Sequence, residues 1–301
     1  MEFSRNDVAA FLEAVRSGSV SRAAETLGVT QPSVSKAIRR LEDDVGVQLA
    51  ERGAHGIRLT SEGQLFLETA KRYEAQHFEL VRLASELRAR HSGLLRMGIT
   101  SPASDSLAVH AMSELVRRRP GMRLQLRIGK SDELNSAVED GILDAAVVPS
   151  YPGQTWSCAQ VALTIEDVQV VVRNRHPLTR KTDVSLEDLA PFAWVMASQH
   201  SAARQLLQSV LQNHGAPAPH VAVEADYMSE AAMGVVAKTD LLSIVPSPVL
   251  QGWLGRVVPL SIPQLHFQRT QVLLTRPQAT WSPLMTDLRD LLLASRPRSG
   301  R

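Results

Sequence analysis

Two short helical patterns joined by one glycine constrain this chain more than any other stretch. Residues 21–27 carry small apolar side chains at helical spacing, and residues 31–45 repeat that spacing with a longer apolar stripe. The stripe of the second pattern consists of Val34, Ala37, Ile38, Leu41 and Val45. Two helices that meet at a tight glycine turn, here Gly28, form a helix-turn-helix. The major groove of duplex DNA is wide enough to admit the second helix.

The outward face of the second helix suits contact with DNA. Thr30 stands where an N-cap is expected, and Pro32 falls in the first turn, where its missing N–H loses no hydrogen bond. Glutamine can pair with adenine, lysine with guanine, and serine or arginine with bases or phosphates. A merely solvated helix face could carry the same residue types, but the preceding helix and the capped turn favour DNA. The predicted contacts on this helix are Thr30, Gln31, Pro32, Ser33, Ser35, Lys36, Arg39 and Arg40.

A helix on the N-terminal side is expected to complete the module. Residues 6–17 predict that helix, with Asn6 or Asp7 as its cap. Ser21 is expected to cap the first helix of the helix-turn-helix, and we assign Ser21 and Arg22 to the DNA contacts as well.

A short hairpin is expected after the second helix. Residues 47–60 alternate around two glycines and predict a β-hairpin wing. Arg52 and Arg58 flank its tip, where they could reach phosphate or a minor groove. The alternative for each arginine is an exposed, solubilising charge, and the neighbouring helix-turn-helix favours the phosphate contact.

Residues 19–52 together resemble the signature of the LysR-type transcriptional regulators. A Thr60-x-x-Gly63 element follows at the spacing usual in that family, whereas Ala50 stands where the family usually has Phe, which should loosen packing beneath the wing. The matching positions are Ala23, Ala24, Leu27, Thr30, Gln31, Pro32, Ser33, Ser35, Lys36, Ile38, Leu41, Glu42, Gly46 and Leu49. The resemblance implies sequence-specific promoter binding that a small-molecule effector modulates, and assembly as a homodimer or homotetramer.

Charge and cysteine content narrow the possible partners. The chain of 301 residues has a formal net charge of only +2, and residues 1–60 contain eight basic and eight acidic residues. A DNA-binding field must therefore come from the placement of charge. Cys158 is the only cysteine, so an intrachain disulfide switch and a four-cysteine zinc site are excluded, and a buried small hydrophobe is the expected role. We predict no metal and no cofactor.

The location of the protein is inferred from its apolar runs. The N-terminus has no signal-peptide pattern, and no apolar run is long enough to cross a bilayer. A cytoplasmic protein with access to DNA is expected.

Residues 61–91 predict one long helix with a heptad seam. One row of the seam is Phe66, Tyr73, Leu80 and Leu87, and the offset row is Ala70, His77, Ala84 and His91. Such a seam pairs helices in a coiled coil, or it packs on the helix's own wing domain; the stripe extends past that domain, which favours pairing. His77 is interpreted as a packed or partly exposed histidine, in preference to a pH switch or a ligand. In the family this helix is the dimer linker.

The remainder of the chain alternates strands and helices. From Gly93 the order is β-α-β-α-β, and a second such unit begins near Asp167, which predicts parallel sheets with covering helices. No GxGxxG or GxxxxGK[ST] motif follows any strand. The fold class is thus α/β with an N-terminal all-α winged helix-turn-helix. By resemblance, the α/β part is an effector domain of two Rossmann-like subdomains similar to type II periplasmic binding proteins.

These patterns predict five segments. They are residues 1–60 (DNA binding), 61–92 (linker helix), 93–165 (subdomain I), 166–268 (subdomain II) and 269–301 (return to subdomain I and tail).

Ligands of such folds bind at loops beyond the carboxyl ends of strands. With the resemblance, this rule nominates three loops and two wall segments, and it leaves ordinary helix capping as the alternative for each Ser or Thr. The nominated residues are Thr100, Ser101, Ala103, Val148, Pro149, Ser198, Gln199, His200, Ser201, Tyr227, Met228 and Pro246. Many relatives have an Arg soon after the strand that ends near Ser198, whereas Arg204 is expected inside a helix here, which leaves open whether the effector is an organic acid.

Two other classes of function compete with a regulator. An enzyme would need a catalytic constellation, and the chain has no GxSxG elbow and no HExxH motif. A secreted solute receptor would need a signal peptide and would not carry a helix-turn-helix. A regulator that is not an enzyme is the prediction.

Overall fold

The computed structural model describes residues 3–53, 56–89, 93–100, 106–199, 201–277 and 279–295. They form two compact units, one of residues 1–84 with 140–142 and one of residues 85–139 with 143–301. Each unit has its own apolar core. Among the described residues, no helix has the length and apolar character needed to cross a membrane.

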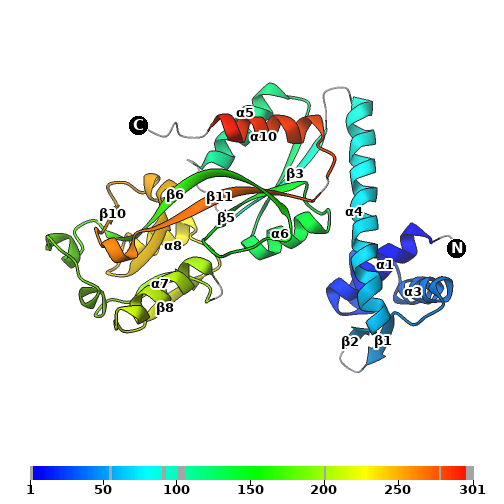
Figure 1. The fold of residues 1–301 in the computed structure, drawn as a ribbon, viewed down its shortest axis with the longest axis horizontal. Coiled ribbons are helices and arrows are strands. Elements are labelled where there is room, and N and C mark those ends of the chain that lie inside the picture. Colours follow the sequence, from blue (N-terminus) through cyan, green and yellow to red (C-terminus); the bar gives the residue numbers. More distant parts are fainter. Residues whose placement is uncertain are drawn as a thin grey trace. The chain divides into compact units, whose positions relative to one another are not determined.

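The first unit is a winged helix-turn-helix followed by a long helix, as the sequence predicts (Figure 1). Phe11, Leu41 and Leu49 are fully buried at its centre and join the three short helices to the wing. The elements are α1 (Arg5–Ser17), α2 (Val20–Leu27), α3 (Gln31–Val45), β1 (Ala50–Gly53), β2 (Gly56–Leu59) and α4 (Ser61–Ala89).

The turn of the helix-turn-helix follows from local chemistry. Thr30 caps α3, because its side-chain oxygen accepts a hydrogen bond from the Ser33 N–H at 3.4 Å, and Pro32 lies in the first turn. Gly28 ends α2 with a φ of 65°, a left-handed conformation that glycine adopts without strain. These predictions are confirmed.

Two predicted caps are wrong. Ser19, not Ser21, caps α2 by accepting a hydrogen bond from the Arg22 N–H, because the helix begins one residue before Ser21. The cap position of α1 is Ser4, whose side chain makes no cap bond, and Asp7 lies inside the helix with 3% of its surface exposed. A polar side chain near a helix start can thus be recruited by a tertiary partner instead of by the helix end.

The Thr60-x-x-Gly63 element joins the wing to α4. The Thr60 hydroxyl donates to the Gln48 carbonyl at 2.8 Å and accepts from the Gly63 N–H at 2.9 Å. A Cβ on Gly63 would come within 1.9 Å of the Leu49 carbonyl oxygen, so only glycine lets the helix approach the chain there. The motif is therefore explained by close backbone packing.

The second unit is built on one mixed sheet of nine strands. Its order is β4-β3-β5-β11-β6-β9-β7-β8, with β10 paired to β6. The strands are β3 (Leu94–Ile99), β4 (Arg123–Ile128), β5 (Ala145–Ser150), β6 (Ala159–Arg173), β7 (Trp194–Ala197), β8 (Val221–Ala225), β9 (Leu242–Pro246), β10 (Val257–Pro259) and β11 (Phe267–Thr275).

Two long antiparallel strands link two parallel half-sheets. Strands β3, β4 and β5 run parallel in subdomain I, and β7, β8 and β9 run parallel in subdomain II. Between them β6 and β11 pair with each other over most of their length (Figure 1). The expectation that a strand begins near Asp167 is wrong, because β6 starts at Ala159, where an exposed and weakly apolar stretch is held by its pairing with β11.

Helices cover both half-sheets. Subdomain I buries α5 (Leu107–Arg118) and the C-terminal α10 (Pro283–Ala294) in one core, so the chain returns to this subdomain at its end (Figure 1). The other helices are α6 (Ser131–Glu139), α7 (Ala202–Asn213), α8 (Glu230–Val236) and α9 (Ser247–Gln251). The short helix α9 is not predicted by the sequence pattern.

His176 is a fully buried histidine whose ring holds a turn in subdomain II. Its Nδ1 accepts a hydrogen bond from the Leu178 N–H at 3.1 Å and caps the 3₁₀ turn Pro177–Arg180, while the ring packs 4.5 Å from Phe192 between centroids. Burial lowers the pKa of the imidazole below its ordinary value, so the fold holds the neutral ring.

We expect this histidine to make the second unit less stable in mild acid. Because its folded pKa lies below the unfolded value of 6.5, its contribution to stability is complete above that pH and is lost as the pH falls through the folded pKa. His176→Asn keeps a capping acceptor that does not titrate. Between about pH 7.5 and about pH 5.5, its melting temperature should therefore fall less than that of the parent. Equal losses in both proteins would contradict the assignment.

Candidate DNA-binding surface and ligand cleft

Helix α3 presents its predicted polar face to solvent. Its apolar stripe is buried against α1, while Gln31, Lys36 and Arg39 are exposed. Ser35 is half-buried, and the remaining exposed members of the predicted set are Ser21, Arg22, Thr30, Pro32, Ser33, Arg40 and Arg58. The side chain of Arg52 lies outside the described residues. A continuous set of hydrogen-bonding side chains therefore faces outward from one helix.

Arg40 differs from its neighbour Arg39 in having a partner inside the unit. Its Nε donates to the buried Asp7 carboxylate at 3.1 Å, and a second guanidinium nitrogen also contacts that carboxylate. The hydrogen bond that Arg40 donates to Asp7 raises the pKa of Arg40. Within the described residues, no hydrogen bond or ion pair involves the Arg39 side chain. Arg40 thus ties α3 to α1, a role that the sequence pattern did not predict.

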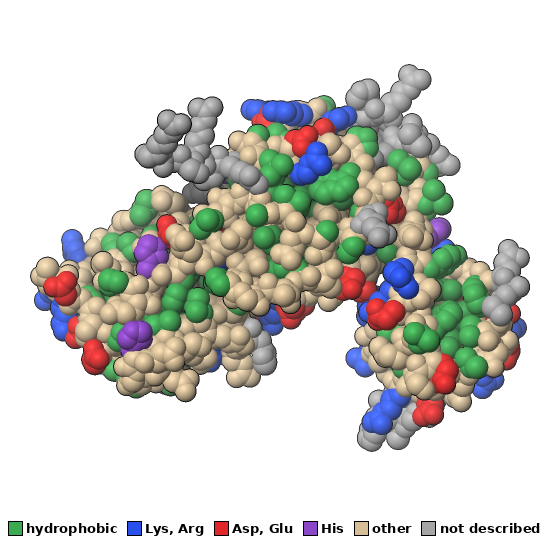
Figure 2. Space-filling model, in the orientation of Figure 1, with side chains coloured by type: hydrophobic (Ala, Val, Ile, Leu, Met, Phe, Trp, Pro, Cys, Tyr) green, Lys and Arg blue, Asp and Glu red, His purple; other side chains and the backbone are tan. Residues whose placement is uncertain are grey.

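Charges of both signs are interspersed on the N-terminal unit. On the face seen in Figure 2, basic and acidic side chains alternate around apolar ones, with no single basic field. This agrees with the equal numbers of acids and bases in residues 1–60. A field that attracts DNA would therefore have to come from the local placement of these charges, not from their sum.

The second unit contains a cleft of about 1310 Å³ between its subdomains. Its lining comes from the residues that follow β3, β4 and β5 on one side and β7, β8 and β9 on the other, with β6 and β11 contributing between them. The carboxyl ends of two parallel half-sheets thus open onto one space, which is where such folds place ligands.

Most of the nominated residues meet in this cleft. Those that line it are Thr100, Pro149, Ser198, Ser201, Tyr227, Met228 and Pro246. Val148 does not line the cleft, because it lies within β5 and is fully buried. Gln199 is not part of the lining either. Ser101, Ala103 and His200 lie outside the described residues.

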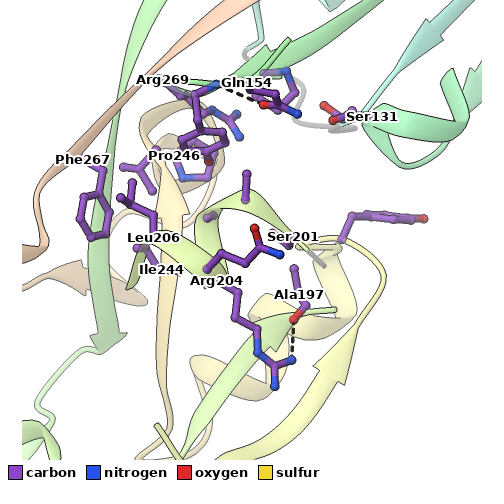
Figure 3. Close-up of a pocket in the computed structure, with 18 of the residues that line it drawn as sticks. Ser131, Gln154, Ala197, Ser201, Arg204, Leu206, Ile244, Pro246, Phe267 and Arg269 are labelled. Atoms are coloured by element: carbon purple, nitrogen blue, oxygen red, sulfur yellow. Dashed lines mark hydrogen bonds between the residues drawn. The ribbon is translucent and has the colours of Figure 1, made fainter. Parts of the chain in front are cut away.

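The start of α7 leaves backbone donors at the cleft. Ser201 occupies the cap position but its side chain makes no cap hydrogen bond, and Ser201, Ala202 and Ala203 line the cleft. Uncapped N–H groups and the helix dipole favour an anion at such a position. An apolar wall of Leu206, Ile244 and Phe267 lies nearby (Figure 3).

The arginines of the cleft are held by acids. Arg204 donates to the Ala197 carbonyl at 3.0 Å and to Glu224 at 2.6 Å, so its guanidinium is turned to the ends of β7 and β8 (Figure 3). Arg269 donates to Glu166 at 2.8 Å, and both side chains are about nine-tenths buried. Sequence reasoning missed Arg269 because its partner lies 103 positions away.

A lysine and an aspartate meet across the cleft. Lys130, which follows β4, lies 3.0 Å from Asp226, which follows β8. The hydrogen bond that Lys130 donates to Asp226 raises the pKa of the Lys130 ammonium, so the lysine is charged. Sequence reasoning missed this pair as well. The rule that ligands bind beyond strand ends covers both positions, but no pattern singles them out.

Comparison with known proteins decides the family. Residues 5–64 match the model described as bacterial regulatory helix-turn-helix protein, lysR family, and residues 88–296 match the LysR substrate binding domain. The chain belongs to the LysR family. It is therefore a transcription regulator with a DNA-binding helix-turn-helix and an effector-binding domain, and not an enzyme.

Regulators from several bacteria resemble this LysR-family chain. The regulator PcaQ of Agrobacterium fabrum is 31% identical over 215 residues, which are 71% of this chain and 69% of PcaQ. The regulator YtlI of Bacillus subtilis is 28% identical over 185 residues, which are 58% of this chain and only 56% of YtlI.

Solved structures of LysR regulators share the fold. A variant of full-length OxyR from Pseudomonas aeruginosa has a TM-score of 0.66 at 22% identity and covers 98% of this chain and 95% of its own. CbnR in complex with its target DNA has a TM-score of 0.60 at 20% identity and covers 98% of this chain and 100% of its own. At these identities the likeness concerns the fold, and it confirms the predicted fold class.

The two neighbouring arginines of α3 should separate stability from DNA binding. Arg40→Ala leaves the buried Asp7 carboxylate without its partner and should lower the melting temperature of the first unit. Arg39→Ala should keep the melting temperature and reduce the slope of log affinity against log salt by about one. Thermal unfolding and DNA titration at several salt concentrations measure both effects. The opposite assignment is correct if Arg39→Ala unfolds the unit and Arg40→Ala does not.

Proposed function

We propose that this LysR-family regulator reads DNA with the exposed face of α3 and supports that helix with phosphate contacts from the wing. The proposal rests on the two faces of α3. Its apolar stripe is buried, while Gln31, Lys36 and Arg39 face outward. Gln and Lys can make base-specific hydrogen bonds in the major groove, whereas Arg58 on β2 can bind phosphate. The wing and the start of α2 supply the other predicted contacts.

The proposed dimer forms through the outer part of α4. Phe66 is occupied within its own unit, where its ring packs 5.7 Å from Phe11, so the start of the seam belongs to the wing domain. Farther along, Tyr73 and Leu80 are 44% and 65% exposed, a row that a second α4 would cover. Leu87 and His91 lie outside the residues whose side chains are described. Two recognition helices would then face half-sites about 34 Å apart, and a homotetramer would bridge two such sites.

The proposed effector is a small organic acid. Its carboxylate would accept hydrogen bonds from the uncapped start of α7, and its carbon skeleton would contact the apolar wall of Leu206, Ile244 and Phe267. Binding between the subdomains would change their geometry and so the DNA affinity of the oligomer. A cytoplasmic location would give the protein access to both proposed ligands, DNA and the organic acid.

The recognition helix can be tested by a double substitution. Gln31→Ala with Lys36→Ala should abolish sequence-specific DNA binding, because both direct base contacts are lost, while effector binding and the melting temperature stay unchanged. The measurement is fluorescence anisotropy with a duplex that the parent protein selects from a random pool. Gln64→Ala with Lys71→Ala removes the same residue types from α4 and is the matched control. If the first variant still selects the same duplexes, α3 does not read the sequence.

The proposed carboxylate site can be tested at Ser201. An aspartate there would cap α7 and place a negative charge where the effector carboxylate is proposed to bind, so Ser201→Asp should keep or raise the melting temperature. It should also weaken by about tenfold or more the affinity for organic acids, measured from the concentration dependence of the thermal shift, since a charge-assisted hydrogen bond is replaced by repulsion. Ser209→Asp, farther along the same helix, is the control. A parent that responds to neutral amides and not to acids would contradict an acid effector.

A further inference from the structure

The two edge strands of the large sheet end beside each other. Strands β4 and β8 stand at opposite ends of its hydrogen-bonded order, one in each subdomain. The residues just after them nevertheless meet, because Lys130 Nζ lies 3.0 Å from a carboxylate oxygen of Asp226. The chain of paired strands is thereby closed by an ion pair between its ends.

This ion pair spans the cleft. Both residues are part of the cleft lining, Lys130 from subdomain I and Asp226 from subdomain II. The subdomains are also linked through β6 and β11, which pair along their backbones. Side-chain contacts between these strands include the buried Glu166–Arg269 pair and the hydrogen bond from Gln271 to Glu166. A movement that opens the cleft about β6 and β11 must separate Lys130 from Asp226.

The pair is placed so that it can open and close. The side chains of Lys130 and Asp226 are 39% and 75% exposed, so water replaces each partner readily. The Asp132 and Glu133 side chains belong to the same subdomain as Lys130 and also line the cleft, so the ammonium keeps nearby carboxylates after separation. Exposed ion pairs of this kind change an equilibrium by small factors and weaken in salt.

We propose that Lys130 and Asp226 form a latch that holds the empty cleft closed, and that the effector enters when the latch opens. The inference rests on the proposed function in one respect, that the cleft receives the effector. The latch itself is a property of the ligand-free protein. It sets the fraction of molecules with an open cleft, and the apparent affinity for any effector that enters through the mouth scales with that fraction.

The latch can be tested by distance measurement in the full chain without any ligand. Spin labels are attached at Ser113→Cys on α5 and Gln212→Cys on α7, both exposed, after Cys158→Ala removes the native thiol. Labelled chains are mixed with a large excess of unlabelled chains, so that pulsed electron resonance reports the distance within one subunit. Asp226→Asn should shift the ratio of closed to open molecules by about two- to fivefold toward open.

Charge exchange and salt make the test specific. Asp226→Lys alone should open the cleft further, and Lys130→Asp combined with Asp226→Lys should restore the distance distribution of the parent. Raising the salt to about 1 M should open the parent and leave Asp226→Asn unchanged. Asp188→Asn breaks the Lys181–Asp188 ion pair, which lies within subdomain II, and is the matched control.

Each outcome decides the proposal. It is supported if only the variants that break the cross-cleft pair open the cleft and the exchanged pair closes it again. It is overturned if Asp226→Asn gives the same distribution as Asp188→Asn, or if the exchanged pair stays open. Because no effector is used, either result leaves the DNA and effector proposals to their own experiments, and a failure of those leaves the latch measurement valid.

Discussion

The antiparallel pairing of β6 with β11 is the interaction on which the effector domain depends. It joins two parallel half-sheets and turns their carboxyl ends toward one space, so the cleft exists only because these strands pair. Near one end of this pairing Glu166 and Arg269 form an ion pair that is about nine-tenths buried, and Gln271 adds a hydrogen bond to the same carboxylate at 2.9 Å. A buried pair with such support fixes register, because losing either partner leaves a charge without compensation.

Charge pairing also governs how the cleft can work. Arg204 and Arg269 are both held by acids, and Lys130 is held by an acid of the other subdomain. At the start of α7, which lines the cleft, the backbone donors have no side-chain cap. In the proposed mechanism, an anionic effector would meet the helix N–H groups at the start of α7, and the Lys130–Asp226 pair would control access to the cleft.

Much of this protein could be predicted from its sequence. The helix-turn-helix, the wing, the long helix and nearly all later strands depend on local periodicity and caps, and the loops after strands led to Thr100, Pro149 and Ser198 in the cleft. Two of the errors share one cause. Asp7, expected as a cap, is recruited by Arg40, and the first half of β6 is ordered by β11. Both involve partners far apart in the chain, which local patterns do not report.

By itself, the sequence determined the class of the protein, because a helix-turn-helix is specified by the spacing of apolar residues and by a capped glycine turn within some twenty positions. Only the tertiary structure decided which charged side chains form ion pairs and which face solvent. Arg39 and Arg40 are adjacent and chemically identical, yet one is committed to Asp7 and the other faces solvent. Lys130 and Asp226 are separated by 95 intervening residues and become partners only when the two edge strands end together. Folding brings such charges within a few ångströms of each other, the range over which they form ion pairs.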